Sequence, residues 1–231
     1  MMISITKSQP EPKELADERA KLNGTYRVAS VLDRLREDFY DKCYICESKN
    51  PTSVNVEHFI PHKGNKGLEF SWNNLFWSCA HCNNTKLAKY DNILNCTDPE
   101  DNIENRIKFM IEPVPFARVN IEALDQEEKT IQTVELLNKV YNGSTHLKVI
   151  EADYIREALV DEMLEFYKLL QSYAKSTNEQ LKNIFFLQII DELDSSSAFS
   201  AFKRQLIKKH SNLMKIFGES FDTPSEEFNA S

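Results

Sequence analysis

The fold of this chain is decided by a stretch that begins with CYIC at residues 43–46 and ends with CAHC at residues 79–82. A Cys-x-x-Cys spacing directs two thiolates to one centre, and two such pairs supply the four ligands of a tetrahedral zinc ion. The 32 residues between the pairs exceed the gap of a plain zinc ribbon, so a folded element must lie between them. We therefore predict a structural zinc site formed by Cys43, Cys46, Cys79 and Cys82.

The alternative interpretation of a Cys-x-x-Cys pair is a thioredoxin-like redox site, but two pairs enclosing a histidine-rich segment favour metal. The N-terminus lacks the apolar run of a signal peptide, and no segment approaches the ~20 apolar residues that span a bilayer. We expect a cytoplasmic protein without membrane association, whose thiols stay reduced. Cys96 has no partner at metal-binding spacing, and we expect an ordinary thiol, buried or half-buried.

The residues between the cysteine pairs predict two short strands and a helix. VNVEHFIPH at residues 54–62 begins by alternating apolar and polar side chains, which predicts a strand that ends at Glu57-His58. A glycine-containing loop follows, then a second strand at WNNLFW, residues 72–77, and a helix over residues 79–90. We assign Trp72 and Trp77 to the packing of this small core, with stacking on nucleobases as the alternative.

This pattern resembles the HNH (ββα-metal) endonucleases in their CxxC-stapled form. The resemblance covers about fifty of the 231 residues and depends on Glu57-His58, Asn74-Leu75, Cys82-Asn83 and Lys86. A looser resemblance adds EHFIP at 57–61, WNNLF at 72–76, CNN at 82–84 and the segment from NIL at 92–94 to Asp98-Pro99. These segments resemble the HNH nucleases of bacterial anti-phage systems, of the Septu type and the retron-associated type. Those nucleases work beside an ATPase.

The resemblance implies an endonuclease that hydrolyses phosphodiester bonds in DNA, with RNA as the alternative substrate and an ATPase as protein partner. It implies His58 as the general base, a task that suits the near-neutral pKa of histidine. Asn83, with Glu57 as a second candidate, would bind a divalent ion, and oxygen ligands suit Mg²⁺ or Mn²⁺. Asn74 would hold the loop and orient His58. Many HNH nucleases carry aspartate in place of Glu57, whose longer side chain changes its reach to the metal.

Three further side chains are candidates for contact with nucleic acid. Lys86 and Lys89 on the predicted helix would meet phosphates. His62 in the loop is the weaker candidate, because a loop histidine is usually just solvent-exposed. We assign His81 to the surface rather than to the zinc ion, since four thiolates already complete a tetrahedral site.

The charge is distributed unevenly along the chain. Residues 42–90 hold six Lys and three Glu, within a chain whose net charge is −8. The overall acidity argues against a protein that coats nucleic acid by bulk attraction. With 5 Gly against 14 Phe, the composition favours helical core over loops. We predict an α+β fold, in which a small zinc-stapled ββα-metal nuclease core is embedded in a mainly α-helical protein.

The pattern outside the core predicts further helices and one hairpin. We divide the chain into an N-terminal helical segment (1–41), the nuclease core (42–92), a connecting hairpin and helix (93–143), and a C-terminal helical region with a polar tail (144–231). Helices are predicted over 13–22, from a Thr25 cap to about Tyr40, and over 129–141. The hairpin pairs 107–111 with 117–121 around Pro113-Val114-Pro115. In the C-terminal region, Ser176 and Glu179 have the spacing of a capping box, Ser197 is a candidate cap of the last helix, and Thr223–Ser231 form the tail.

The last predicted helix carries a basic stretch, for which a solvated face and a nucleic-acid contact are both open interpretations. Its members are Lys203, Arg204, Lys208, Lys209 and Lys215. Two other functions compete with the nuclease. One is a catalytically degenerate zinc-stapled module that binds nucleic acid or a partner, and the other is an interaction protein that depends on its helices. The joint presence of His58, Asn74 and Asn83 favours the nuclease.

Overall fold

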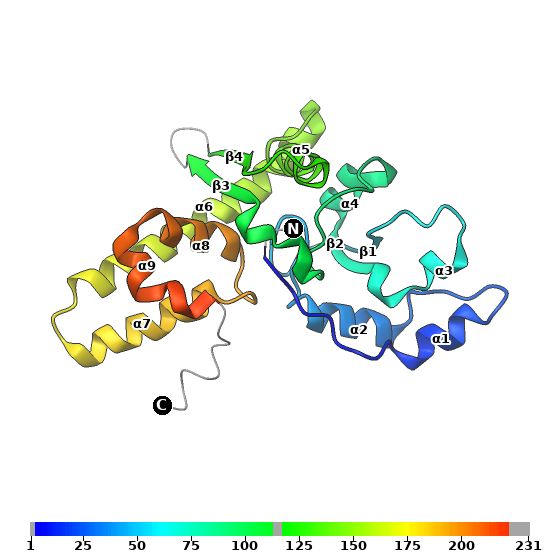
Figure 1. Ribbon diagram of the computed structural model, residues 1–231, viewed down its shortest axis with the longest axis horizontal. Helices are drawn as coiled ribbons and strands as arrows, with labels where there is room; N and C mark the ends of the chain where they lie inside the picture. Colours follow the sequence, from blue (N-terminus) through cyan, green and yellow to red (C-terminus); the bar gives the residue numbers. More distant parts are fainter. Residues whose placement is uncertain (1–2, 113–116, 222–231) are drawn as a thin grey trace.

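The computed structural model describes residues 3–112 and 117–221. Figure 1 shows α1 to α4 with β1 and β2 on one side of the molecule and α7 to α9 on the other, with α5, β3 and β4 between them. The predicted loop at Pro113-Val114-Pro115 and the predicted tail from Thr223 lie outside the described residues.

The segment between the cysteine pairs forms a hairpin followed by a helix. β1 (Val54–His58) pairs antiparallel with β2 (Leu75–Cys79), so that Val54 lies opposite Cys79 and His58 opposite Leu75. α4 (Ala80–Lys86) follows β2 directly and packs on both strands. The loop between the strands contains α3 (Lys66–Glu69) and the 3-10 turn η1 (Trp72–Asn74). The predicted ββα order is therefore confirmed.

Two boundaries of this core differ from the prediction. The second strand begins at Leu75, because Trp72–Asn74 form the turn η1. The helix ends at Lys86, because Leu87 has a φ of 47°, which breaks the helical hydrogen-bond ladder before the 3-10 turn η2 (Leu87–Lys89). All five residues of β2 are buried, since both α2 and α4 pack on this strand. Trp72 and Trp77 are buried, as core packing requires.

The N-terminal segment contributes two helices, α1 (Lys13–Arg19) and α2 (Ala29–Asp38). The predicted Thr25 cap is wrong, because Val28 precedes the first residue of α2 and makes no side-chain cap. The Thr25 hydroxyl instead accepts a hydrogen bond from the Arg27 amide, a local turn that keeps this segment out of the helix. Residues 20–28 therefore form a connection between α1 and α2.

The hairpin and the helix predicted within the connecting region are present, with ends that differ by one or two residues. β3 (Ile107–Glu112) and β4 (Arg118–Ala123) form a second antiparallel hairpin, preceded by the 3-10 turns η3 (Pro99–Asp101) and η4 (Ile103–Asn105). α5 (Glu128–Asn142) packs on β4 and ends at Gly143. Gly143 has a φ of +72°, and an added Cβ would lie 2.5 Å from the Val149 nitrogen, so both its conformation and its surroundings require glycine.

The C-terminal region consists of α6 (His146–Lys175), α7 (Glu179–Leu193), α8 (Ser200–Lys209) and α9 (Ser211–Phe217), followed by the turn η5 (Gly218–Phe221). Both predicted caps in this region are wrong. Asn178 caps α7 by accepting from the amides of Gln180 and Leu181, whereas Ser176 ends α6. The Ser197 hydroxyl donates to Glu192 instead of capping α8, and Phe199, with a φ of 50°, precedes that helix.

The basic stretch is neither a single helix nor wholly solvated. Lys203 is 0% exposed, and its ammonium pairs with Glu162 at 2.8 Å and with Glu192. The Arg204 guanidinium is also buried, where it pairs with Glu104 at 2.8 Å. Lys208 pairs with Glu104 as well, and Lys215 lies on the separate helix α9. The open interpretation as a solvated face is therefore wrong for its two most buried members.

One hydrophobic cluster joins the segment that holds the two cysteine pairs to the rest of the molecule. It extends from Ile5 and α2 through both strand pairs and α5 to Phe202 on α8. A second, smaller cluster packs α6, α7, α8 and α9 around Phe166 and Phe217. The predicted α+β fold, mainly helical with small sheets, is confirmed. No helix in the described part of the chain is long and apolar enough to cross a membrane.

Candidate active site

The four cysteines predicted to bind zinc lie together in the structure. Their sulfur atoms all lie within 4.8 Å of one another, and all four side chains are buried free thiols. The Sγ atoms of Cys46 and Cys79 are 3.9 Å apart. A tetrahedral ion with Zn–S bonds of about 2.3 Å places its sulfurs about 3.8 Å apart. Burial raises the pKa of the Cys82 thiol, so a cation is needed to favour the thiolate there. The cluster fits a structural zinc ion.

His58 lies at the end of β1, where three contacts fix its ring. Its Nε2 lies 3.0 Å from the Glu69 carbonyl oxygen at the end of α3. With Nε2 as the donor in that bond, Nδ1 keeps the lone pair that a general base needs. The ring centroids of Tyr26 and His62 lie 4.7 Å and 4.6 Å from that of His58. Burial lowers the pKa of His58, which favours the neutral, basic form near pH 7.

Asn74 holds the loop that carries these contacts. Its side chain is buried, and its Oδ1 accepts from the Ile60 amide at 2.7 Å. Its Nδ2 donates to the carbonyls of Ile60 and Leu68 at 2.9 Å and 3.0 Å. One amide group thus ties the residues just after His58 to the helix that supplies the Glu69 carbonyl. This is the loop-holding contact expected of Asn74, although its part in catalysis stays a prediction.

Glu57 lies next to His58 on β1 but faces α4, since alternate residues of a strand point to opposite faces. Its Oε1 accepts from the Lys86 ammonium at 2.9 Å, and Lys86 also donates to the His58 carbonyl at 3.2 Å. Burial raises the pKa of Glu57, against the opposing effect of Lys86. Lys86 is 0% exposed. The expected contact of Lys86 with phosphate is therefore not available in this arrangement, because its side chain is enclosed between α4 and β1.

The other predicted residues lie around this centre. Asn83 precedes Lys86 by three residues on α4, which places the two on one helix face toward β1, and it is half-buried. His62 is half-buried beside His58. Lys89 is exposed, and its ammonium lies 3.3 Å from Glu135 on α5. The structure thus brings His62 against His58 and pairs Glu57 with Lys86, while Asn74 holds the loop after His58 and Asn83 lies one turn before Lys86 on α4.

His81 is not the surface residue that we expected. Its Nδ1 lies 2.8 Å from a Glu151 oxygen on α6, and its Nε2 lies 2.9 Å from the Val140 carbonyl on α5. It is not part of the four-cysteine cluster. His81 therefore connects α4 to the helical region, a role that spacing alone does not reveal.

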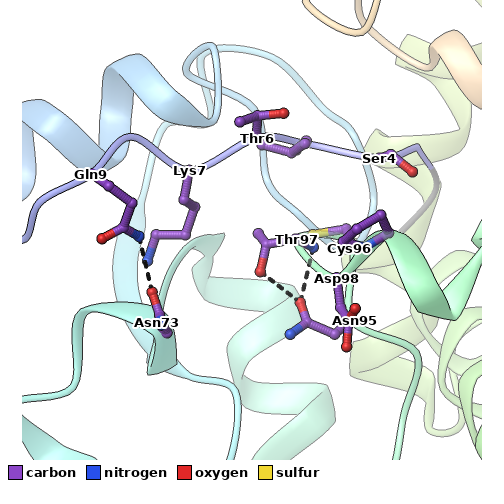
Figure 2. Close-up of a pocket in the computed structure, with 11 residues that line it drawn as sticks. Ser4, Thr6, Lys7, Gln9, Asn73, Asn95, Cys96, Thr97 and Asp98 are labelled. Atoms are coloured by element: carbon purple, nitrogen blue, oxygen red, sulfur yellow. Dashed lines mark hydrogen bonds between the residues drawn. The ribbon is translucent and has the colours of Figure 1, made fainter. Parts of the chain in front are cut away.

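Lys7 was missed by sequence reasoning, although it lies directly behind the loop. Its ammonium donates to the carbonyls of Trp72 and, at 2.8 Å, Leu75, and it lies 4.0 Å from the Trp72 ring centroid. Figure 2 shows Lys7 among the residues that line a pocket of about 450 Å³, beside the hydrogen bond from Gln9 to Asn73. Burial lowers the pKa of Lys7 to about 7. The N-terminal segment is thereby attached to η1 and the start of β2.

Comparison with known proteins places this site in a class. Residues 43–89 match the model of the HNH endonuclease family, so the chain contains an HNH domain there. The resemblance on which we based the site residues is confirmed for this domain. No solved structure significantly matches the chain.

The chain is also similar to two curated proteins, each named Septu protein PtuB. It is 37% identical over 98 residues to the one from Bacillus mycoides (strain KBAB4), a match that covers 36% of this chain and 31% of that protein. It is 31% identical over 112 residues to the one from Bacillus thuringiensis, covering 42% of this chain and 43% of that protein. The match thus spans less than half the length of either relative.

Proposed function

We propose that this chain is a metal-dependent endonuclease that hydrolyses phosphodiester bonds in DNA. The observation that carries the proposal is an HNH domain in which a half-buried His58 has one ring nitrogen held by the Glu69 carbonyl. This arrangement leaves the opposite nitrogen as a base for water. The loop held by Asn74 keeps that geometry without a contribution from the substrate.

His58 would take a proton from the attacking water, and burial keeps its ring neutral near pH 7. Glu57 and Asn83 would hold a divalent ion, because their carboxylate and amide oxygens are the ligand types that Mg²⁺ and Mn²⁺ prefer. Such an ion would neutralise charge on the phosphate and stabilise the leaving 3′ oxygen. Lys86, paired with Glu57, opposes the rise in the pKa of that carboxyl which burial causes. His62 and Lys89 remain candidates for contact with the substrate.

We further propose that the chain is the effector of an anti-phage defence system, that it acts with an ATPase partner and that it resides in the cytoplasm. The similarity to two proteins named Septu protein PtuB supports a role in such a system. Control by a partner also has a physical rationale, because an HNH nuclease that was always active would cleave the DNA of its own host.

One observation favours the competing function, a degenerate module that binds nucleic acid or a partner. The Glu57 carboxylate, which a catalytic ion needs, already binds the Lys86 ammonium at 2.9 Å. A module that never binds a catalytic ion could retain this pair permanently. The two functions differ in one measurable respect, because only the nuclease requires a divalent ion and His58 for a chemical step.

Cleavage of supercoiled plasmid by the purified chain, with Mg²⁺ or Mn²⁺, tests the proposal. We expect nicked or linear product that is lost with EDTA and in the Glu57→Gln variant. If the chain alone gives no product, the assay is repeated with a candidate ATPase partner and with RNA as substrate. Absence of metal-dependent cleavage under all these conditions would favour the degenerate module.

A further inference from the structure

The connection between α1 and α2 lies against the ring of His58, although it lies outside the matched HNH domain at residues 43–89. The Tyr26 ring meets the His58 ring edge to face, with centroids 4.7 Å apart and an interplanar angle of 79°. It also packs against Phe70, at 6.4 Å between centroids. The ring of the expected general base is therefore bounded by a residue that lies outside the matched HNH domain.

We propose that residues 20–28 complete the active site. In this proposal Tyr26 is a positioning residue that fixes the ring of His58, and Arg27 binds a backbone phosphate of the polynucleotide substrate. The proposal rests on the endonuclease function proposed above.

A histidine ring that is held by one hydrogen bond can still tilt. The terminal torsion of histidine has broad, roughly two-fold preferences, so the single bond from Nε2 to the Glu69 carbonyl leaves the tilt of the ring poorly defined. The perpendicular Tyr26 ring and the His62 ring, 4.6 Å away, restrict that tilt. A base that loses this packing still reaches the water but with less frequent alignment, which lowers the rate of the chemical step.

Arg27 is exposed and forms no ion pair with the described residues. Its guanidinium carbon lies 5.4 Å from the Tyr26 ring centroid, and the side chain is exposed. Arg19 and Arg36 pair with Glu11 and Asp41, whereas no carboxylate in the described part of the chain forms an ion pair with Arg27. This exposed guanidinium stacks near the tyrosine that contacts His58, and it has the planar donor geometry that binds phosphate oxygens in pairs.

Hydrogen bonds hold residues 20–28 in a defined position. The Lys66 ammonium at the start of α3 donates to the carbonyls of Lys21 and Leu22, at 3.0 Å and 3.4 Å. The Thr25 amide donates to a Glu18 oxygen at 2.9 Å. The same short helix, α3, thus holds His58 through the Glu69 carbonyl and residues 20–28 through Lys66. The helix α3 therefore positions both the Glu69 carbonyl and the connection that carries Tyr26, two of the groups that contact the His58 ring.

The first experiment tests Tyr26 with two substitutions. We expect Tyr26→Leu to lower kcat for plasmid nicking by about 10–100-fold with little change in KM, the range for residues that orient a catalytic group. Tyr26→Phe keeps the ring and restores the rate. Tyr154→Leu, an exposed tyrosine on α6, is the matched control. Equal loss of kcat in the Phe and Leu variants, or none in either, would overturn the positioning role.

An NMR readout keeps the test of Tyr26 independent of cleavage. The ring current of Tyr26 shifts the His58 ring protons in the folded chain, and we expect the shift to disappear in Tyr26→Leu and to persist in Tyr26→Phe. If the wild-type chain does not cleave any substrate, the proposed function fails but this spectrum still reports the contact. Unchanged His58 signals in Tyr26→Leu would overturn the contact between the two rings, and with it the positioning role of Tyr26.

The second experiment measures binding of a DNA duplex by fluorescence anisotropy, in a His58→Ala background that cannot turn over. We expect Arg27→Ala to weaken binding and to reduce the slope of log K against log salt by about 1, the signature of one lost phosphate contact. Arg118→Ala, an exposed arginine on β4, serves as the matched control for loss of one charge. An affinity and slope equal to those of the control would overturn the assignment of Arg27.

Discussion

At the scale of single residues, the pair of Glu57 and Lys86 is the least expected feature of the site. Its two charges are 2.9 Å apart, with side-chain exposures of 8% and 0%. Removal of ions from water costs several kcal/mol per ion, so a buried pair contributes little net stability, whereas loss of one partner is costly. Substitution of either Glu57 or Lys86 alone is therefore expected to lower the stability of the fold, whether or not the pair also takes part in metal binding.

We predict that Lys86→Met lowers the free energy of unfolding by about 3–5 kcal/mol, because it leaves the Glu57 carboxylate buried without its partner. The double variant Glu57→Gln with Lys86→Met should recover most of that loss. Urea unfolding of the zinc-loaded chains measures both values. A loss below about 1 kcal/mol for the single variant would show that Lys86 is solvated in solution.

A second prediction at this scale concerns Lys7 and pH. Its pKa is about 7 in the folded chain against 10.5 ordinarily, so between these values the unfolded chain binds more protons. The free energy of unfolding therefore rises with pH in this window, and below about pH 7 the buried charge exerts its full destabilising effect. Lys7→Met removes this dependence. We expect the free energy of unfolding of the variant minus that of the wild type to decrease as the pH rises from 7 to 10. The decrease should be at most about 1.4 kcal/mol per pH unit.

Urea unfolding of both chains at several pH values tests this prediction, and the other titrating groups cancel in the comparison. A difference that is constant with pH would mean that the Lys7 ammonium keeps an ordinary pKa. Its two carbonyl acceptors would then offset the effect of burial.

The sequence predicted the residues whose chemistry depends on spacing, and it failed where a role depends on a distant partner. The spacing of the cysteine pairs predicted the four-cysteine cluster that the structure contains, whereas the catalytic roles that the HNH resemblance implies for His58 and Asn74 stay predictions. The burial of Lys86 depends on Glu57, 29 positions away, and that of Lys203 depends on Glu162 and Glu192. The Glu69 carbonyl could not be predicted, since every residue carries such a group.

At the scale of elements, periodic segments were predictable and their ends were not. The hairpin β3–β4 and helix α5 follow their patterns, and α5 ends beside the predicted Asn142-Gly143. All three predicted caps, at Thr25, Ser176 and Ser197, were wrong, because a serine or threonine hydroxyl has several local acceptors and donors to choose from. Asn178 replaced Ser176 as the cap with a side chain equally suited to the task.

The end of α5 gives a prediction with an internal control. Gly143 and Gly64 both have positive φ, but a Cβ at Gly143 would lie 2.5 Å from the Val149 nitrogen, whereas a Cβ at Gly64 would have nothing within 4 Å. We predict that Gly64→Ala costs about 1 kcal/mol from the backbone alone and that Gly143→Ala costs at least about 2 kcal/mol more. Thermal unfolding measures both. Equal shifts in Tm would mean that the α5–α6 connection adapts to the added methyl group.

At the scale of the whole molecule, the four-cysteine cluster is a junction between the HNH domain and the C-terminal helices. The Tyr141 hydroxyl on α5 donates to the Cys46 carbonyl at 2.9 Å. The buried Lys42 ammonium donates to the carbonyls of Ser195 and Ser197, and a Glu47 oxygen accepts from the Ala201 amide on α8. The loop that carries the first cysteine pair is thus also the surface on which α8 is docked.

We predict that removal of zinc by a chelator lowers Tm and increases hydrogen exchange in α8 as well as in residues 43–90. Structural zinc contributes about 10 kcal/mol or more of folding free energy in small peptides, and here its loss would also release the Lys42 and Glu47 hydrogen bonds that dock α8. Amides of α7, which packs in the second cluster, are the internal reference. Faster exchange confined to the nuclease core would show that the helices are docked independently of zinc.

The central claim, that His58 performs metal-dependent phosphodiester hydrolysis, is tested most directly by the rate of plasmid nicking in Mn²⁺. The comparison is between the wild-type chain, His58→Ala and His146→Ala, with His146 as an exposed histidine at the start of α6. We predict nicking by the wild type and His146→Ala at similar rates, and a loss of at least about 100-fold in His58→Ala, the range for a general base. Equal nicking by His58→Ala would contradict the claim.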